Sequence, residues 1–168
     1  MTRPVLVLVG PPGAGKTTVG RLLAERLGVP FRDTDHDVEQ VAGKPIPEIF
    51  YDDGEERFRE LEREAVARAL GEHEGVLCLG GGAVLSEQTR RLLQGHRVVL
   101  LLVGLADAAK RVGLSRDRPV LALNPRASLH KLLEERMPLY LEVATQTVET
   151  DGKTPEQVVD QVVDEVLQ

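Results

Sequence analysis

Residues 5–17 read Val5-Leu-Val-Leu-Val9-Gly10-Pro-Pro-Gly-Ala-Gly15-Lys16-Thr17, and they decide the fold class of this chain. Val5 to Val9 is apolar at every position, which is typical of a central strand buried on both faces of a parallel sheet. Gly10 to Thr17 matches the pattern G-x-x-x-x-G-K-[ST], which binds phosphate when it lies between a strand and a helix. Residues 17–27 supply that helix, because their apolar side chains recur at helical spacing. The pattern therefore predicts a phosphate-binding loop.

The residues of this loop suit the binding of a nucleoside triphosphate. Glycine at 13 and 15 permits close approach of backbone N–H groups to phosphate oxygens, and the following helix directs its positive dipole end at them. Lys16 would bridge the β- and γ-phosphates, and the Thr17 hydroxyl would ligate Mg²⁺. A glycine-rich turn with an incidental lysine is disfavoured, because both flanks are correct. The residues expected to bind the nucleotide are Gly13, Ala14, Gly15, Lys16, Thr17 and Thr18.

Outward from the loop, the chain alternates short apolar runs with longer helical patterns. The expected strands are 5–9, 30–32, 75–79, 97–103 and about 147–149. The expected helices are 17–27, 37–42, 47–52, 55–70, 86–94, 107–112, 127–141 and one that begins at 155. Ser86 and Thr154 are the expected N-caps of two of them. This alternation is typical of an α/β fold, a parallel sheet covered by helices on both faces. Residues 113–125 lack periodicity and contain two prolines, so we predict a mobile loop there.

Composition restricts the class of protein. The 168 residues fit one domain, and 27 acidic residues against 21 Lys and Arg give a net charge of −6. Nucleic acid is not expected as a partner, because phosphate neutralisation needs the opposite excess. The longest apolar runs, 5–9 and 98–103, are far shorter than the roughly 18 residues of a membrane span, so no membrane is expected. With one cysteine, Cys78, and no signal-peptide pattern, we expect a cytoplasmic protein.

Two acidic residues at the end of the second expected strand are candidates for metal binding and proton transfer. P-loop proteins commonly place an aspartate after a hydrophobic strand, yet the run from Val76 to Gly80 ends with no acid. Asp33 and Asp35 are the nearest alternatives, since active groups of open α/β sheets gather at the carboxyl ends of strands. One could face the metal while the other accepts a proton. Equally, Asp33 could open a turn, and Asp35 could cap the next helix.

Several arginines and a glycine run remain open to two interpretations. Arg59 and Arg136 lie on expected helices, where arginine is usually solvated or an i,i+4 partner. Arg118 lies in the expected mobile loop, from which it could reach the phosphates when the loop closes, although exposed loop arginines are more often solubilising. Gly80 to Gly82 offer bare backbone to a ligand, or form a tight turn. Position alone favours the structural interpretation of the arginines.

The chain as a whole resembles the shikimate kinase family. The matching segments are Gly10 to Thr17, Asp33 to Asp35, Glu48 to Phe50, Gly54-Glu55, Phe58 to Glu62, Gly80 to Ala83, Arg118-Pro119 and Arg136 to Tyr140. The phosphate loop is generic, whereas the combination of Asp-x-Asp, Phe-Arg-x-x-Glu, triple glycine and Arg-x-Pro-Leu-Tyr is specific. These segments span nearly the whole chain.

This resemblance implies a function and an architecture. The function is transfer of the γ-phosphoryl group of ATP to the 3-hydroxyl of shikimate, on the route to chorismate and aromatic amino acids. The architecture is a P-loop NTPase fold of three layers, α/β/α, with about five parallel strands. Within a single domain, 1–168, the substrate-binding helices would be about 34–62 and the mobile lid about 113–125.

The resemblance also implies roles for individual residues. Asp33 would support Mg²⁺ with Thr17, and the catalytic groups would be Asp35 as the base, Lys16 and Arg118. Arg111 and Arg118 would join the ATP-binding residues, and the loop at Thr154-Pro155 would lie on the adenine side. The residues implied for shikimate binding are Asp35, Arg59, Gly80, Gly81, Gly82 and Arg136. In this set Arg59 and Arg136 would clamp the substrate carboxylate.

Two rival functions share part of this pattern. A gluconate-type or other small-metabolite kinase has the ATP half but should lack a paired-arginine carboxylate clamp. A nucleotide-dependent switch needs no acceptor pocket, so the joint presence of Asp35, Arg59, Arg136 and Arg118 disfavours it. We expect a monomeric enzyme with ATP and shikimate as substrates and Mg²⁺ as cofactor.

Overall fold

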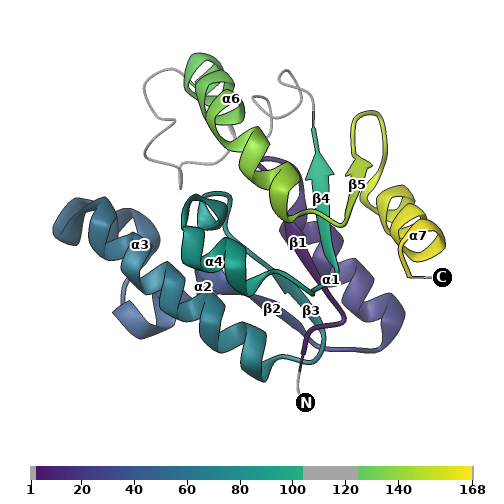
Figure 1. The fold of residues 1–168 in the computed structure, drawn as a ribbon, viewed down its shortest axis with the longest axis horizontal. Helices are drawn as coiled ribbons and strands as arrows, with labels where there is room; N and C mark the ends of the chain where they lie inside the picture. The colour runs from purple at the N-terminus through teal and green to yellow at the C-terminus, as the bar shows by residue number, and fades with distance from the viewer. Residues whose placement is uncertain (1–2, 104–124, 168) are drawn as a thin grey trace.

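The computed structural model describes residues 3–103 and 125–167. Its strands form one parallel five-stranded sheet in the order β2-β3-β1-β4-β5 (Figure 1). The strands are β1 (Leu6–Val9), β2 (Phe31–Asp33), β3 (Val76–Cys78), β4 (Val98–Leu102) and β5 (Gln146–Glu149). The expected sheet is thus confirmed, and each strand end lies within one residue of its predicted position.

Helices cover both faces of the sheet and make the three expected layers (Figure 1). The helices are α1 (Lys16–Leu27), α2 (Thr34–Ala42), α3 (Ile46–Glu72), α4 (Glu87–Leu92), α6 (Pro125–Val143) and α7 (Pro155–Glu165). Along β1, Leu6 and Leu8 enter the core under α1 and α7, whereas Val7 and Val9 enter the core under α3, α4 and α6. This alternation explains why the first strand is apolar at every position.

Helices α2 and α3 share a small core of their own, beside the sheet. Its buried residues are Val38, Ile49, Phe58, Leu61 and Ala65. The aromatic rings of Phe50 and Phe58 pack there with centroids 4.9 Å apart. Because this core spans both segments of α3, it fixes the helix that carries Arg59 relative to the first turn of α2.

Three helix starts show how capping sets the boundaries. Helix α2 begins three residues earlier than expected, because the Asp33 carboxylate accepts a hydrogen bond from the Asp35 N–H at 2.9 Å and so caps it. The expected caps are confirmed at α4, where Ser86 accepts from Thr89 N–H, and at α7, where Thr154 forms a capping box. A 3₁₀ turn, η1 (Ala83–Leu85), was not predicted.

Two helices differ from their expected lengths. Helix α3 joins the two expected helices 47–52 and 55–70, and Gly54, with φ 86° and ψ 166°, interrupts its regular geometry where the break was predicted. Helix α6 runs four residues beyond the expected span, two at each end, and continues through Pro138. The expected helix 107–112 and residues 113–124 of the expected lid lie outside the described residues; residue 125 already belongs to α6.

The topology places three loops at one edge of the sheet. The phosphate loop follows β1, Asp33 ends β2, and Gly80 follows β3, and these three strands are neighbours in a parallel sheet. Their carboxyl ends therefore meet at the same edge. Within the described ranges, no helix has the length and apolar character needed to span a membrane.

Candidate active site

The phosphate loop is held closed by its own lysine. Lys16 is buried, and its Nζ donates to the carbonyl oxygens of Gly10 at 2.7 Å and Pro11 at 3.1 Å. Gly13 and Gly15 adopt φ angles of 82° and 85°, the left-handed region that favours glycine. No side chain caps the N-terminus of α1, so its first-turn N–H groups are directed toward the loop, where an anion can accept from them.

A hydroxyl and two carboxylates join the loop to the second strand. Thr17 Oγ1 donates to Asp33 Oδ2 at 3.1 Å, while Asp33 Oδ1 accepts from the Asp35 backbone. Asp33 therefore caps α2 and contacts the phosphate loop at the same time, so the two interpretations of this residue are compatible. Asp35 lies in the first turn of α2 and does not cap it.

A cavity of about 190 Å³ connects these groups. Its lining residues are Gly13, Gly15, Lys16, Thr17, Thr18, Asp33, Asp35, Cys78 and Leu79. The structure thus brings the lysine of the phosphate loop and both expected carboxylates to the walls of one cavity. A phosphoryl group and an acceptor hydroxyl would meet there at the carboxyl edge of the sheet.

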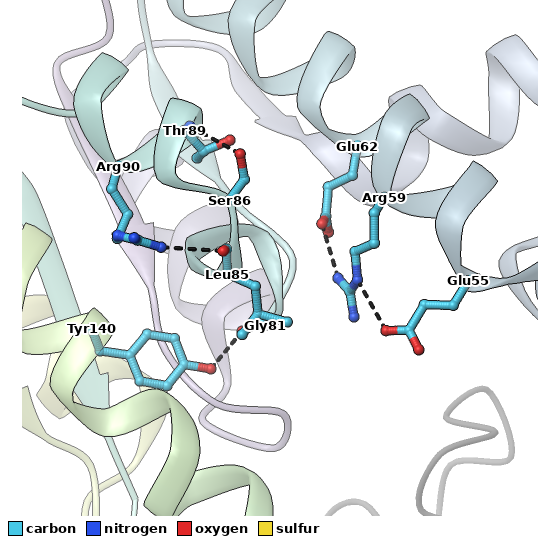
Figure 2. A network of polar contacts seen from close by, with 9 residues as sticks. All are labelled: Glu55, Arg59, Glu62, Gly81, Leu85, Ser86, Thr89, Arg90 and Tyr140. Carbon is cyan, nitrogen blue, oxygen red and sulfur yellow. Dashed lines mark hydrogen bonds and ion pairs between the residues drawn. The ribbon is translucent and has the colours of Figure 1, made fainter.

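The glycine turn after β3 packs tightly against charged side chains. A Cβ atom on Gly80 would stand 2.5 Å from Asp35 Oδ1 and 3.1 Å from Glu62 Oε2. A Cβ atom on Gly82 would overlap the guanidinium of Arg59. Gly81 lies beside Pro12 of the phosphate loop, and its carbonyl accepts a hydrogen bond from the Tyr140 hydroxyl (Figure 2). A side chain at Gly80 or Gly82 would therefore displace Asp35, Glu62 or Arg59, a close approach that the turn-only interpretation does not explain.

Arg59 is held in place by two carboxylates on its own helix (Figure 2). Its Nη1 donates to Glu62 Oε1 at 2.9 Å, and its Nε donates to Glu55 Oε2 at 3.4 Å. Its guanidinium also lies 5.1 Å from the centroid of the Phe58 ring. The Arg59 side chain is 18% exposed, so the solvated-face interpretation fails for it.

Arg136 reaches the same region from α6. It is only 7% exposed, and its positive charge acts on the Glu62 carboxyl, as does the charge of Arg59. A buried arginine is uncommon unless an anion compensates it, so the solvated interpretation fails here too. Arg136 is buried, Arg59 is half-buried, and the charges of both act on Glu62, so the two guanidinium groups could together bind a carboxylate bidentately.

Comparison with known proteins agrees with this arrangement. A model of the shikimate kinase family matches residues 12–167. The chain belongs to the shikimate kinase family. It is 67% identical to the shikimate kinase of Salinispora arenicola, over 92% of this chain and 93% of that protein. It is 64% identical to the shikimate kinase of Saccharopolyspora erythraea, over 97% of this chain and 94% of that protein.

The fold matches that of a solved relative. The shikimate kinase from Acinetobacter baumannii, solved in complex with shikimate, superimposes with a TM-score of 0.94 at 38% identity. The match covers 99% of this chain and 94% of that one. The predicted P-loop fold and the resemblance to shikimate kinases are thereby confirmed.

The candidate site of this shikimate kinase family member contains residues that were not assigned a role from the sequence. Glu62 is 3% exposed, and its Oε2 has no hydrogen-bond partner among residues 3–103 and 125–167. Burial raises the pKa of the Glu62 carboxyl, the Asp35 charge raises it further, and Arg59 and Arg136 oppose this shift. The Phe-Arg-x-x-Glu motif was the available signal for Glu62, but an i,i+3 pair on a charged helix is indistinguishable from a surface pair in sequence.

Cys78 was expected to be a plain core residue, yet it also lines the cavity. Its Sγ donates to the Lys16 carbonyl at 3.2 Å from the end of β3. Burial raises the pKa of its thiol, so the group stays neutral and unreactive at ordinary pH. No sequence pattern marked this contact, because it joins residues 62 positions apart.

Of the remaining predicted residues, two line a second cavity and two lie outside the described residues. Ala14 and Thr18 line a cavity of about 260 Å³, together with residues of α7 and the loop before it. Gly15 and Thr18 line both cavities, so the two adjoin. Arg111 and Arg118 lie outside the described residues.

Proposed function

We propose that this protein transfers the γ-phosphoryl group of ATP to the 3-hydroxyl of shikimate, giving shikimate 3-phosphate and ADP. The observation that carries the proposal is the shared cavity of Lys16 and Asp35, with the half-buried Arg59 and the buried Arg136 acting on the neighbouring Glu62. Membership of the shikimate kinase family supports the same substrates. The relative from Acinetobacter baumannii was solved with shikimate bound.

Asp35 is the general base in this proposal. The 3-hydroxyl of the acceptor would donate to the Asp35 carboxylate, which accepts its proton as the oxygen attacks phosphorus. Gly80 allows the acceptor ring to approach Asp35, because no side chain separates their backbones. Lys16 would move from the Gly10 and Pro11 carbonyls to the β- and γ-phosphates when the nucleotide enters. No covalent intermediate is needed, since positioning and electrostatics suffice.

Two arginines fix the other end of the acceptor. Arg59 and Arg136 bind the shikimate carboxylate, and the backbone of Gly80 to Gly82 contributes further contacts. Glu62 holds Arg59 in position through the 2.9 Å ion pair. Arg118 closes over the phosphates in this proposal, and Arg111 contacts adenine.

Thr17 and Asp33 form the proposed magnesium site. A hydroxyl and a carboxylate oxygen 3.1 Å apart at the phosphate loop fit a hard cation that prefers oxygen ligands. Within the described ranges, no group of three His, Cys, Asp or Glu side chains could hold a metal ion. The remaining ligands would therefore be phosphate oxygens and water, the usual arrangement for Mg²⁺ with nucleotides. When bound, the ion neutralises charge on the transferring phosphoryl group.

The second cavity is the proposed adenine side of the ATP site. It adjoins the phosphate cavity through Gly15 and Thr18, and Pro155 and Val158 of α7 give it apolar surface. A purine ring needs such a surface close to the phosphates. The Thr154-Pro155 loop would therefore contact adenine, as the family resemblance implied.

We infer the cellular setting from the net charge and from the single cysteine, Cys78. We infer a single-domain monomer in the cytoplasm, with the helical region at about 34–62 as the substrate-binding part. The net charge of −6 keeps such a protein from nucleic acid, and Cys78, at 1% exposure, has no disulfide partner in the chain.

The decisive experiment measures ADP release with Mg²⁺ and ATP in the presence of shikimate, gluconate, nucleoside monophosphates or no acceptor. Release that requires shikimate supports the proposal, whereas equal release without an acceptor indicates an ATPase or switch. Release with gluconate alone would favour the rival kinase.

Asp35→Asn should lower kcat by about two decades or more, because the base is lost. Lys16→Ala should lower it similarly through lost charge stabilisation.

A further inference from the structure

The sequence motif Arg136 to Tyr140 ends in a tyrosine to which the proposed function assigns no role. Tyr140 is 1% exposed, on α6, one turn after Arg136. Its hydroxyl donates to the carbonyl oxygen of Gly81 at 2.5 Å (Figure 2). This bond spans 59 positions of sequence and reaches the middle residue of the glycine turn.

A second set of hydrogen bonds also connects the glycine turn to α6. Arg90 of α4 donates through Nη1 to the carbonyl oxygens of Val84 at 2.7 Å and Leu85 at 3.1 Å. Through Nε it donates to Glu142 Oε2 of α6 at 3.0 Å. Arg90 thereby connects the 3₁₀ turn that continues the glycine turn to α6, two residues beyond Tyr140. Its bond to the Leu85 carbonyl is drawn in Figure 2.

The glycine turn and α6 meet both arms of the proposed carboxylate clamp: the turn packs against Arg59 of α3, and α6 carries Arg136. Gly82 lies directly against the guanidinium of Arg59, so the position of the turn sets the position of that group. Arg136 belongs to α6 itself. A shift of the turn along α6 would therefore change the separation of the two guanidinium groups, and bidentate binding is sensitive to that separation.

Pro138 makes α6 easier to bend, so hydrogen bonds to other elements are needed to hold the part of the helix beyond it. Pro138 lies between Arg136 and Tyr140. It has no N–H, so it cannot donate the helical hydrogen bond to the Glu134 carbonyl. A helix bends most easily at such a position. The contacts of Tyr140 and Glu142 lie on the far side of the proline from Arg136, where they fix the end of α6 that its own hydrogen bonds restrain less.

We propose that Tyr140 is a positioning residue for the acceptor site, acting with Arg90, and that its hydroxyl sets the glycine turn relative to α6. The proposal rests on the proposed function, since it assumes that Arg59 and Arg136 bind the shikimate carboxylate. Tyr140 lines neither of the two cavities. It acts through the Gly81 carbonyl, and the turn meets Arg59 at Gly82 and Pro12 of the phosphate loop at Gly81.

The first test removes only the hydroxyl. Tyr140→Phe keeps the buried ring and leaves the Gly81 carbonyl without this donor. We expect the KM for shikimate, and its Kd from calorimetry without nucleotide, to rise roughly three- to tenfold, as for loss of one buried hydrogen bond. The KM for ATP should change less than the KM for shikimate, because the turn touches the phosphate loop only where Gly81 lies beside Pro12. Leu141→Ala is the control on the same helix, since Leu141 is 55% exposed and lines neither cavity.

The second test examines the second set of hydrogen bonds. Arg90→Gln should raise the shikimate KM and Kd in the same way, and it decides the question alone if Tyr140→Phe does not fold. Arg91→Gln is its control, because Arg91 lies on the same helix, is 73% exposed and pairs only with Glu87 in the described structure. Both controls should bind shikimate as the wild type does.

The outcomes separate the inference from the proposed function. If the wild type neither binds shikimate nor releases ADP with it, the proposed function fails, and the inference falls with it. If the wild type is active and Tyr140→Phe lowers the melting temperature while leaving shikimate Kd unchanged, the tyrosine is merely structural and the inference is wrong. An equal rise in both KM values would also overturn it.

Discussion

Asp35 Oδ1 lies so close to Gly80 that a methyl group on this glycine would stand 2.5 Å from it. The same methyl group would lie 3.1 Å from Glu62 Oε2. Gly80→Ala must therefore displace the proposed base or the turn. We expect kcat with shikimate to fall about tenfold or more, since small misplacement of a catalytic group is costly. Steady-state kinetics with shikimate and ATP varied in turn will measure this loss.

Gly71→Ala is the matched control for this substitution. Gly71 lies in α3, and nothing within 4 Å would meet its Cβ atom. Alanine there should raise the free energy of unfolding by about 0.5–1 kcal/mol, because glycine in a helix has greater conformational entropy to lose. Its kinetics should be unchanged. Wild-type kinetics for Gly80→Ala would show that Asp35 is not constrained by the turn.

Thr17 and Asp33 predict a metal phenotype. Thr17→Ala removes a hydroxyl from the proposed magnesium site, so the Mg²⁺ concentration for half-maximal rate should rise about tenfold or more. Thr17→Ser keeps the hydroxyl and should stay near the wild type. The measurement is the initial rate against Mg²⁺ at fixed ATP. Superimposable curves for Thr17→Ala and the wild type would remove Thr17 from the site.

The sheet and the phosphate loop were predictable because their signals are local. An apolar strand, a glycine loop with Lys16, and a helix that follows can be recognised within one short window. Capping residues such as Ser86 and Thr154 are equally local, and both were identified correctly. The start of α2 was missed, because an aspartate that caps a helix and one that ends a strand look alike in sequence.

The acceptor side depends on contacts between distant segments, and residue patterns alone did not reveal it. Arg59 and Arg136 looked like surface residues, and only their burial in the folded chain distinguishes them. Resemblance to a family supplied those residues where physical reasoning from spacing could not. Glu62 and Tyr140 were quoted within motifs but given no role, because each acts through a partner on another element or turn.

The capping box of α7 gives a stability prediction. Thr154 accepts from the Gln157 N–H at 3.1 Å, and the Gln157 side chain accepts from the Thr154 N–H at 2.8 Å. Thr154→Ala should lower the free energy of unfolding by about 1 kcal/mol, since the Gln157 N–H loses its acceptor. Thr154→Ser should keep most of it. Urea unfolding of the three proteins measures the difference, and equal midpoints would show that the cap contributes nothing.

Glu62 makes stability depend on pH in an unusual direction. Burial is the main cause of the raised pKa of its carboxyl, and the ion pair with Arg59 only partly offsets it. The native state therefore holds this proton more tightly than the unfolded chain does. The resulting stability is fully present below the ordinary pKa of 4.5 and is lost as pH rises through the raised value.

Glu62→Gln removes this titration while keeping the shape of the side chain. The free energy of unfolding of the wild type, minus that of the variant, should fall as pH rises from about 4 and then level off. The fall should be at most about 1.36 kcal/mol per pH unit, because one proton is involved. Urea unfolding across that range measures it, with the exposed Glu55→Gln as a control for lost charge beside Arg59. If the difference instead grows with pH, the ion pair with Arg59 outweighs burial, and Glu62 remains a full negative charge in the acceptor site.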